Sequence, residues 1–184
     1  MVDSFHVIAS RRLGGAERFF VRLVEALNEK GHKAVAVVRE DGMIKEQLDN
    51  RVRRIYVGMR NNYDLFSSLK LRRYINKERP PIVQTYMGRA TRLTRVAPDK
   101  GSIHIARLGG FYRISGYYRH AHAWIGNTKG ICDYLSRAGI PADRIFLIGN
   151  FVDIMDPTPA EHLISLRRSL EIPEDAIIIF SLAR

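Results

Sequence analysis

The order of the first apolar segments constrains the fold of this chain more than any other feature. Residues 5–9 form a short apolar run, and Gly14 and Gly15 follow it. Residues 17–30 then carry apolar side chains at helical spacing, Gly31 is placed to end that helix, and residues 34–38 are apolar again. A strand, a glycine turn, a helix and a strand in this succession form a βαβ unit, whose two strands lie parallel in one sheet.

The same alternation continues along the chain. Asn127 or Thr128 is suited to cap one of the later helices, and Gly139 to end it. Alternating strands and helices predict an α/β fold, namely a Rossmann-like, doubly wound, mainly parallel sheet. We predict further strands at residues 54–57, 82–86, 103–107, 123–126 and 145–148, and further helices at residues 63–77, 89–96 and 129–138.

A domain boundary is expected after Asp153, where the prolines Pro157 and Pro159 indicate a linker. Residues 1–153 would form one Rossmann-like domain. Residues 154–184 would supply a linker helix at 160–170 and the first strand, at 176–182, of a second domain. Because a strand of a parallel sheet needs neighbours to bond with, we expect the chain to be truncated as this second domain begins.

Composition limits the cell compartments and the classes of partner that are possible for this chain. The single cysteine, Cys132, excludes an intramolecular disulfide and a cysteine-based metal cluster, and no apolar run reaches the length of a membrane span. The N-terminus lacks the features of a signal peptide, so we expect a reduced, cytoplasmic compartment. A net charge of +11 and a pI near 10.1 indicate an anionic partner, whether nucleic acid, an acidic membrane face or a phosphorylated ligand.

Four segments, in order and spacing, resemble glycosyltransferase family 4, a family of retaining enzymes with the two-domain GT-B fold. The resemblance covers nearly the whole chain and implies the acceptor-side, N-terminal half of such an enzyme. The segments are Gly-Gly-Ala-Glu at 14–17, Pro-Pro-Ile-Val-Gln-Thr-Tyr at 80–86, Ile-Gly-Asn-Thr at 125–128 with its following helix, and Ile-Gly-Asn-Phe-Val-Asp at 148–153.

The glycine turn is the first candidate site. A turn of this kind before a helix lets backbone N–H groups approach a phosphate, where the helix dipole favours negative charge. The resemblance implies that Gly14 and Gly15 meet the diphosphate of the donor, with Arg11 adding charge; the alternative is a tight turn without a ligand. Glu17 and Glu25 have the spacing of the family's donor-site glutamates, but that motif belongs to the second domain.

The resemblance leaves the catalytic residues unknown. Leu108 stands where the family usually carries a cleft histidine after its fifth strand. Arg107, Tyr112 and Tyr86 are therefore candidates for holding the acceptor or the departing diphosphate. The alternative is that the arginine is paired and the tyrosines are packed for structural reasons.

Basic residues are concentrated between positions 51 and 95. Within residues 51–77 only Asp64 opposes them, and aromatic side chains lie among the cations. Such a surface suits anionic lipid or a phosphorylated saccharide acceptor, while the plainer alternative is a solvated face. The candidate residues of this surface are Arg60, Arg72, Arg73, Arg89, Arg92 and Arg95. The spacing of Arg89, Arg92 and Arg95 would place these three on one helix face.

Neither a metal nor a cofactor is expected. His120 and His122 flank one residue, but no third ligand lies at metal spacing near them. Members of the resembled family typically need no metal, and the chain has no Asp-x-Asp motif.

The resemblance implies transfer of a hexosyl group from a UDP- or GDP-hexose to a cell-surface saccharide or glycolipid, with lipopolysaccharide as one acceptor. We expect the protein at the inner face of the membrane as a peripheral protein, and this chain alone to be inactive. A non-catalytic half-domain with only a binding role remains a second hypothesis. A nucleic-acid-binding module is a third, although no recognised binding motif supports it.

Overall fold

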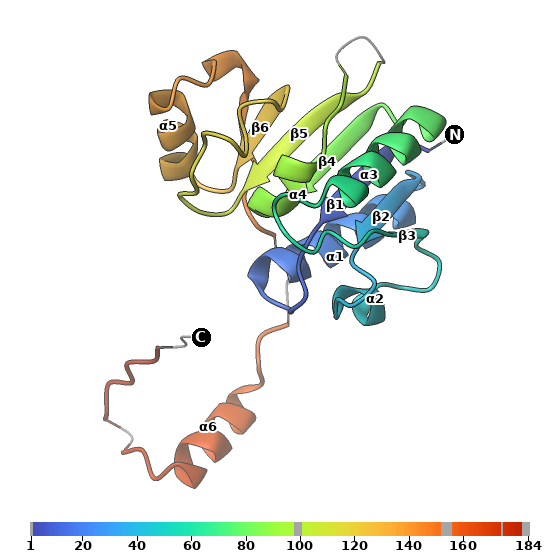
Figure 1. The fold of residues 1–184 in the computed structure, drawn as a ribbon. Coiled ribbons are helices and arrows are strands. Elements are labelled where there is room, and N and C mark those ends of the chain that lie inside the picture. Colours follow the sequence, from blue (N-terminus) through green and yellow to red (C-terminus); the bar gives the residue numbers. More distant parts are fainter. Residues whose placement is uncertain (1, 98–100, 152–155, 174, 182–184) are drawn as a thin grey trace. The chain divides into compact units, whose positions relative to one another are not determined.

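The computed structural model describes residues 2–97, 101–151, 156–173 and 175–181. The chain divides into two compact units, Met1–Phe151 and Val152–Arg184. The first contains the sheet, and Figure 1 shows its strands and helices.

The first unit is built on a seven-stranded sheet, parallel throughout, in the order β3-β2-β1-β4-β5-β6-β7 (Figure 1). The chain builds outward from β1 on one side and from β4 on the other, so the strand order reverses between these two strands. The Rossmann-like α/β prediction is confirmed. The strands are β1 (Ser4–Ile8), β2 (Ala34–Val38), β3 (Arg54–Tyr56), β4 (Ile82–Tyr86), β5 (Ile103–Leu108), β6 (Ala123–Gly126) and β7 (Ile145–Leu147).

The five predicted helices are present in the predicted order, with differences at their ends. The one-turn helix α2 was not predicted, and α4 starts earlier than expected and ends at Leu93, where Thr94 turns extended. The helices are α1 (Gly15–Glu29), α2 (Ile44–Gln47), α3 (Leu65–Glu78), α4 (Met87–Leu93), α5 (Lys129–Arg137) and α6 (Ala160–Ser169), and Ala142–Arg144 forms a 3₁₀ turn.

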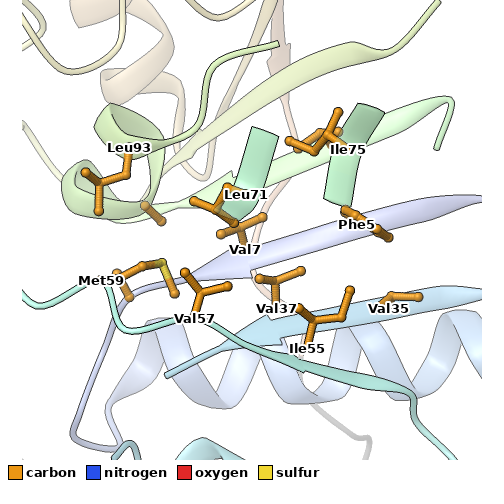
Figure 2. Packing of buried hydrophobic residues seen from close by; sticks show 13 residues of the cluster. Phe5, Val7, Val35, Val37, Ile55, Val57, Met59, Leu71, Ile75 and Leu93 are labelled. Carbon is orange, nitrogen blue, oxygen red and sulfur yellow. The ribbon is translucent and has the colours of Figure 1, made fainter. Parts of the chain in front are cut away.

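Apolar side chains fill both faces of the sheet, which explains why the strands read as continuous apolar runs. On one face Phe5 and Val7 of β1 meet Leu71 and Ile75 of α3, as Figure 2 shows. The opposite face, which includes Ile8, is covered by α1 and α2. A third cluster surrounds the buried Trp124 and joins β5 and β6 to α5.

The predicted helix ends at three positions are confirmed. Gly31 and Gly139 have φ angles of 86° and 80°, which disfavour any residue with a Cβ atom. Thr128 is the N-cap of α5, and its Oγ1 accepts from the Ile131 N–H at 3.3 Å.

The second unit contains α6 and otherwise extended chain. The strand predicted at 176–182 is not formed over the described residues 176–181, and Leu182 lies outside them. The physical reason is that an extended apolar run becomes a strand only when a neighbouring strand accepts its hydrogen bonds. Within the described ranges, no helix is long and apolar enough to cross a membrane.

Candidate functional site

A cavity of about 450 Å³ opens at the carboxyl ends of β1 and β4. Its wall consists of residues 9–12, which follow β1, residues 87–89, which follow β4, and Asn62. Ile8 and Tyr86 are register partners, so the two segments leave the sheet side by side. This is the point where the strand order reverses, which is where open α/β sheets bind their ligands.

The charged side chains in this wall are all cationic: Arg11, Arg12 and Arg89. The nearby carboxylate of Asp41 lies 2.6 Å from Arg11 and 2.7 Å from Arg39. Hydrogen bonds from Arg39 and then from Arg11 hold the pKa of Asp41 well below its usual range. Because two guanidinium groups share this one carboxylate, the cavity keeps an excess of positive charge and is suited to an anionic ligand.

Arg89 is only partly committed to the protein. Its Nη1 lies 3.4 Å from the carbonyl oxygen of Met59, and its buried Nε has no partner within the described part of the chain. Met59 and Met87 both have positive φ angles, 44° and 66°. Met87 belongs to the cavity wall, and a strained backbone conformation of this kind at a ligand-sized cavity is typical of functional sites.

The glycine turn lies after the same strand as the cavity but outside its wall. Gly14 is the N-cap of α1 in an extended conformation and provides no side-chain cap. A Cβ atom built on Gly15 would have nothing within 4 Å, so open space adjoins the first turn. The first N–H groups of α1 lack intrahelical partners, as at every helix start, and can bind an anion. The acidic Glu17 of this turn is buried.

Tyr86 is placed in the core, where its hydroxyl is already used. Its Oη bonds Nδ1 of His6 at 2.9 Å and accepts from Nε2 of Gln84 at 2.7 Å, and Nε2 of His6 bonds Oγ of Ser4 at 3.0 Å. The tyrosine is 1% exposed, and burial raises its pKa. This network connects β1 and β4 and gives Tyr86 no access to a ligand in the cavity.

Arg107 lies beneath α1, away from the cavity wall. Its guanidinium carbon is 3.7 Å from the centre of the Phe19 ring, and its Nη2 donates to Oδ1 of Asn150 at 2.6 Å. Burial lowers its pKa, and its Nε has no partner in the described chain. It lines a second cavity, of about 480 Å³ and mostly apolar, between α1 and strands β1, β4, β5 and β6.

The third catalytic candidate is separate from both. Tyr112, in the segment after β5, is 38% exposed, stacks on Tyr118 with ring centres 6.4 Å apart, and accepts at its carbonyl from the Tyr134 hydroxyl. Leu108, at the position where a histidine was expected, is fully buried in the core cluster around Trp124. The three candidates are thus held in three different environments.

The basic residues divide into two groups. Arg92 donates to the carbonyl oxygens of Asn62 and Gly116, both at 2.9 Å, and lies over the rings of Tyr63 and Tyr117. It therefore ties α4 to neighbouring loops. Arg95 follows the end of α4, so the predicted shared helix face of Arg89, Arg92 and Arg95 is wrong for its last member. The exposed group comprises Arg60, Arg72, Arg73 and Arg95.

His104, His120 and His122 are engaged in the packing of the first unit. Nε2 of His104 bonds Oγ1 of Thr85 at 3.0 Å, and Nδ1 of His122 accepts from the His104 N–H at 3.1 Å. Nε2 of His120 bonds the Thr91 carbonyl at 2.8 Å. Among the described residues no group of three His, Cys, Asp or Glu side chains could hold a metal ion.

Of the residues in the cavity wall, the sequence predicted Arg11 and Arg89 as site residues and did not predict Asn62 or Met87. Asn62 is separated in sequence from both strands that bound the site, and Met87 carries no functional group that would single it out. Only the strand register brings them together with residues 9–12.

Comparisons with known proteins place the chain among glycosyltransferases. The sequence profile described as Glycosyltransferase Family 4 matches residues 13–155. Two proteins of Rhizobium meliloti (strain 1021), the lipopolysaccharide core biosynthesis glycosyltransferases LpsE and LpsD, are 29% and 28% identical over 174 residues. Each match covers 93% of this chain and 48% of the relative, so the chain spans about half the length of the curated relatives it matches.

Solved structures show the same fold. Anabaena Alr3699/HepE in complex with UDP superimposes with a TM-score of 0.71 at 15% identity, over 92% of this chain and 50% of that one. A glycosyltransferase from Rickettsia africae ESF-5 superimposes with a TM-score of 0.64 at 16% identity, over 94% of this chain and 51% of that one.

Proposed function

The chain belongs to glycosyltransferase family 4, and on that basis we propose that it forms the acceptor side of a hexosyltransferase. The reaction is transfer of a hexosyl group, with retention at the anomeric carbon, from a nucleotide sugar to a cell-surface saccharide or glycolipid. The observation that carries this proposal is the cationic cavity at the carboxyl ends of β1 and β4, inside the segment that matches the family.

The proposed donor is a UDP-hexose. Structures of the similar fold of Anabaena Alr3699/HepE have been solved in complex with UDP and with UDP-glucose, which favours UDP over GDP. In this chain the uncapped start of α1 at Gly14 and the open space at Gly15 suit a diphosphate. Arg11, paired with Asp41, lies on the loop between β1 and this turn.

The proposed acceptor is an anionic saccharide, with the lipopolysaccharide core as the named example. The two curated relatives are described as lipopolysaccharide core glycosyltransferases. A cavity of about 450 Å³ is large enough for a sugar unit. Arg12 and Arg89 in its wall would bind a phosphate or carboxylate on that unit through charge-assisted hydrogen bonds.

In this arrangement the residues of the chain would position the acceptor and stabilise the departing diphosphate. Arg12, Arg89 and Asn62 would fix the acceptor so that one hydroxyl faces the anomeric carbon of the donor, which removes much of the entropic barrier. The N–H groups at Gly15 would stabilise the negative charge that develops on the departing diphosphate. We assign no catalytic role to Tyr86, because its hydroxyl is consumed inside the sheet.

We further propose that this protein is cytoplasmic and acts as a peripheral protein at the inner face of the membrane, where a glycolipid acceptor would be found. The chain matches only half the length of its relatives, and so we expect it to bind donor weakly and not to turn over by itself. A purely binding role for this half is the second candidate function, and the same coverage is the observation that favours it.

Two measurements test the proposal. Titration calorimetry of the chain with UDP-glucose, GDP-mannose and UDP should show binding weaker than micromolar, with the UDP ligands preferred. A chimaera that joins this chain to the half of LpsE that it does not match should transfer labelled sugar to lipopolysaccharide lacking that residue. A folded chimaera that binds donor yet transfers sugar to no anionic saccharide would favour the binding-only role. Sub-micromolar donor binding by the chain alone would contradict the proposal that this chain holds only part of the donor site.

A further inference from the structure

Helix α3 is apolar on two opposite faces. On its inner face Leu71 and Ile75 point toward β1, as Figure 2 shows, and both are buried. On its outer face Leu65, Phe66 and Leu69 are 67%, 88% and 55% exposed. At 100° per residue these three lie in one sector of the helix, opposite the buried residues.

The exposed apolar surface extends beyond the helix. Tyr63, just before α3, is 78% exposed, and its ring is held in place by the guanidinium of Arg92, 4.5 Å from its centre. We call Tyr63, Leu65, Phe66 and Leu69 the apolar patch. A contiguous patch of large apolar side chains on a protein surface indicates an interaction site, whereas isolated ones do not.

Cations surround the apolar patch. Arg60 precedes it, Lys70, Arg72 and Arg73 flank it on α3, and each is exposed. No ion pair involves Lys70, Arg72 or Arg73 among the residues that the structure describes. These charges are therefore available to an anionic partner.

The one acidic residue beside the apolar patch, Asp64, carries a single negative charge against the four cations and is used to cap α3. Oδ1 of Asp64 accepts from the Ser67 N–H at 3.0 Å, and its Oδ2 accepts from the Ser67 hydroxyl at 2.7 Å and the Arg60 N–H at 2.9 Å. The carboxylate thus caps α3 and is held by backbone and hydroxyl donors.

We propose that the apolar patch and its cations form a docking surface for the anionic face of a lipid bilayer. A bilayer interface accepts aromatic and aliphatic side chains at the depth of the headgroups and attracts basic residues around them, so it satisfies both features at once. A second copy of this chain would bring like charges of the same surface together. Nucleic acid would meet the cations but has no use for exposed leucines.

The apolar patch adjoins the candidate site. Tyr63 follows Asn62, which lines the cavity, and Arg92 contacts both residues. A chain docked through the apolar patch would hold that cavity close to the headgroup layer. This last link rests on the proposed function, because it assumes an acceptor anchored in the membrane; the docking surface itself does not.

Vesicle flotation of the chain tests the docking surface without donor or acceptor. Vesicles of phosphatidylcholine with about a third phosphatidylglycerol should bind the chain at least tenfold better than pure phosphatidylcholine. Arg72→Gln/Arg73→Gln should weaken this binding about twenty-five-fold, since each basic residue near the surface contributes about fivefold. Lys30→Gln/Lys33→Gln, which removes two exposed charges between α1 and the amino end of β2, should change it less than threefold.

A second measurement separates insertion from electrostatic adsorption. Phe66→Trp places a fluorophore in the apolar patch, while the single natural tryptophan, Trp124, stays buried as a constant background. Its emission should shift to shorter wavelength on vesicle binding and be quenched by lipids brominated in the acyl chain. Ile103→Trp, at an exposed position on β5, should show neither change.

Three results would overturn the proposal. One is equal loss of binding in the Lys30/Lys33 and Arg72/Arg73 variants, and another is unquenched emission of the bound Phe66→Trp chain. The third is a dimer in solution that Leu65→Ser/Phe66→Ser/Leu69→Ser converts to a monomer, which would assign the apolar patch to contact between copies. Failure of sugar transfer in the chimaera, with vesicle binding intact, would count against the proposed function alone.

Discussion

Nη2 of Arg107 donates a hydrogen bond of 2.6 Å to Oδ1 of Asn150, and this amide is the polar partner of a guanidinium that is 4% exposed. The bond joins the end of β5 to the segment that follows β7. Among the described residues no carboxylate pairs with Arg107, and its other close contact is the face of the Phe19 ring. The charge is thus kept in an apolar environment by one amide and one aromatic ring.

This relationship predicts opposite effects for the two partners. Asn150→Ala should lower the free energy of unfolding by about 1–3 kcal/mol, because it leaves a buried donor without an acceptor. Arg107→Met removes the charge and keeps the length of the side chain, so it should be neutral or stabilising by about 1 kcal/mol. Urea unfolding at pH 7 measures both, with the exposed Arg18→Met as the control. A loss in Arg107→Met as large as in Asn150→Ala would show that the guanidinium itself stabilises the fold.

The cationic cavity predicts the effect of removing its charges. Arg12→Gln and Arg89→Gln should each weaken binding of an anionic ligand roughly tenfold or more, because a hydrogen bond to a charged group contributes about 1.5–3 kcal/mol. Calorimetry with glucose 6-phosphate and with pyrophosphate measures the change. Arg137→Gln, on the exposed side of α5, is the control and should bind like the unsubstituted chain. Unchanged affinity in both cavity variants would remove the cavity from consideration as the anion site.

The glycine turn predicts a substitution that affects binding and spares the fold. Gly15→Ala adds a Cβ into open space at a helical position, so helix propensity should raise the free energy of unfolding by up to about 1 kcal/mol. If the proposed diphosphate site lies at this turn, the same methyl group stands where the diphosphate approaches the first N–H groups, and UDP affinity should fall several-fold.

The matched control is Gly31→Ala at the end of the same helix. Gly31 has a φ angle of 86°, so alanine there should cost about 1–2 kcal/mol while UDP affinity stays unchanged. Thermal unfolding and UDP titration of both variants test the pair. Equal UDP binding by Gly15→Ala and the unsubstituted chain would indicate a tight turn without a ligand.

Two buried histidines predict acid sensitivity. Burial lowers the pKa of His6 to about 4 and that of His104 to about 3, from 6.5. Because the unfolded chain binds these protons first, the stability they contribute is complete above pH 6.5 and is lost as the pH falls from there toward 4 and 3. At pH 5 each should have removed about 2 kcal/mol.

Urea unfolding at pH 7.5 and pH 5 checks this. His6→Gln should reduce the difference between the two pH values by about 2 kcal/mol, whatever it does to stability at pH 7.5. The exposed His32→Gln is the control and should leave the difference unchanged. An unaltered difference in His6→Gln would mean that His6 does not lose its charge on folding.

Much of the fold could be predicted from the sequence, because buried parallel strands and amphipathic helices each leave a local pattern of apolar residues, and these patterns alternate along the chain. The turn at Gly14 and Gly15, the helix ends at Gly31 and Gly139 and the cap at Thr128 each depend on the conformational needs of a few neighbouring residues. The strand predicted at 176–182 is not formed over residues 176–181, because an apolar run becomes a strand only next to another strand.

By itself, then, the sequence determined the α/β class, the order of its elements and the family, all of which reside in local periodicity and in ordered motifs. Only the tertiary structure decided which polar groups are free. In the folded chain the hydroxyl of Tyr86 bonds His6 and Gln84, and Arg107 packs on the ring of Phe19. Arg12 and Arg89, by contrast, line a cavity together with Asn62. The physical reason is that the availability of a side chain depends on burial and on partners distant in sequence, which strand register assigns and composition does not.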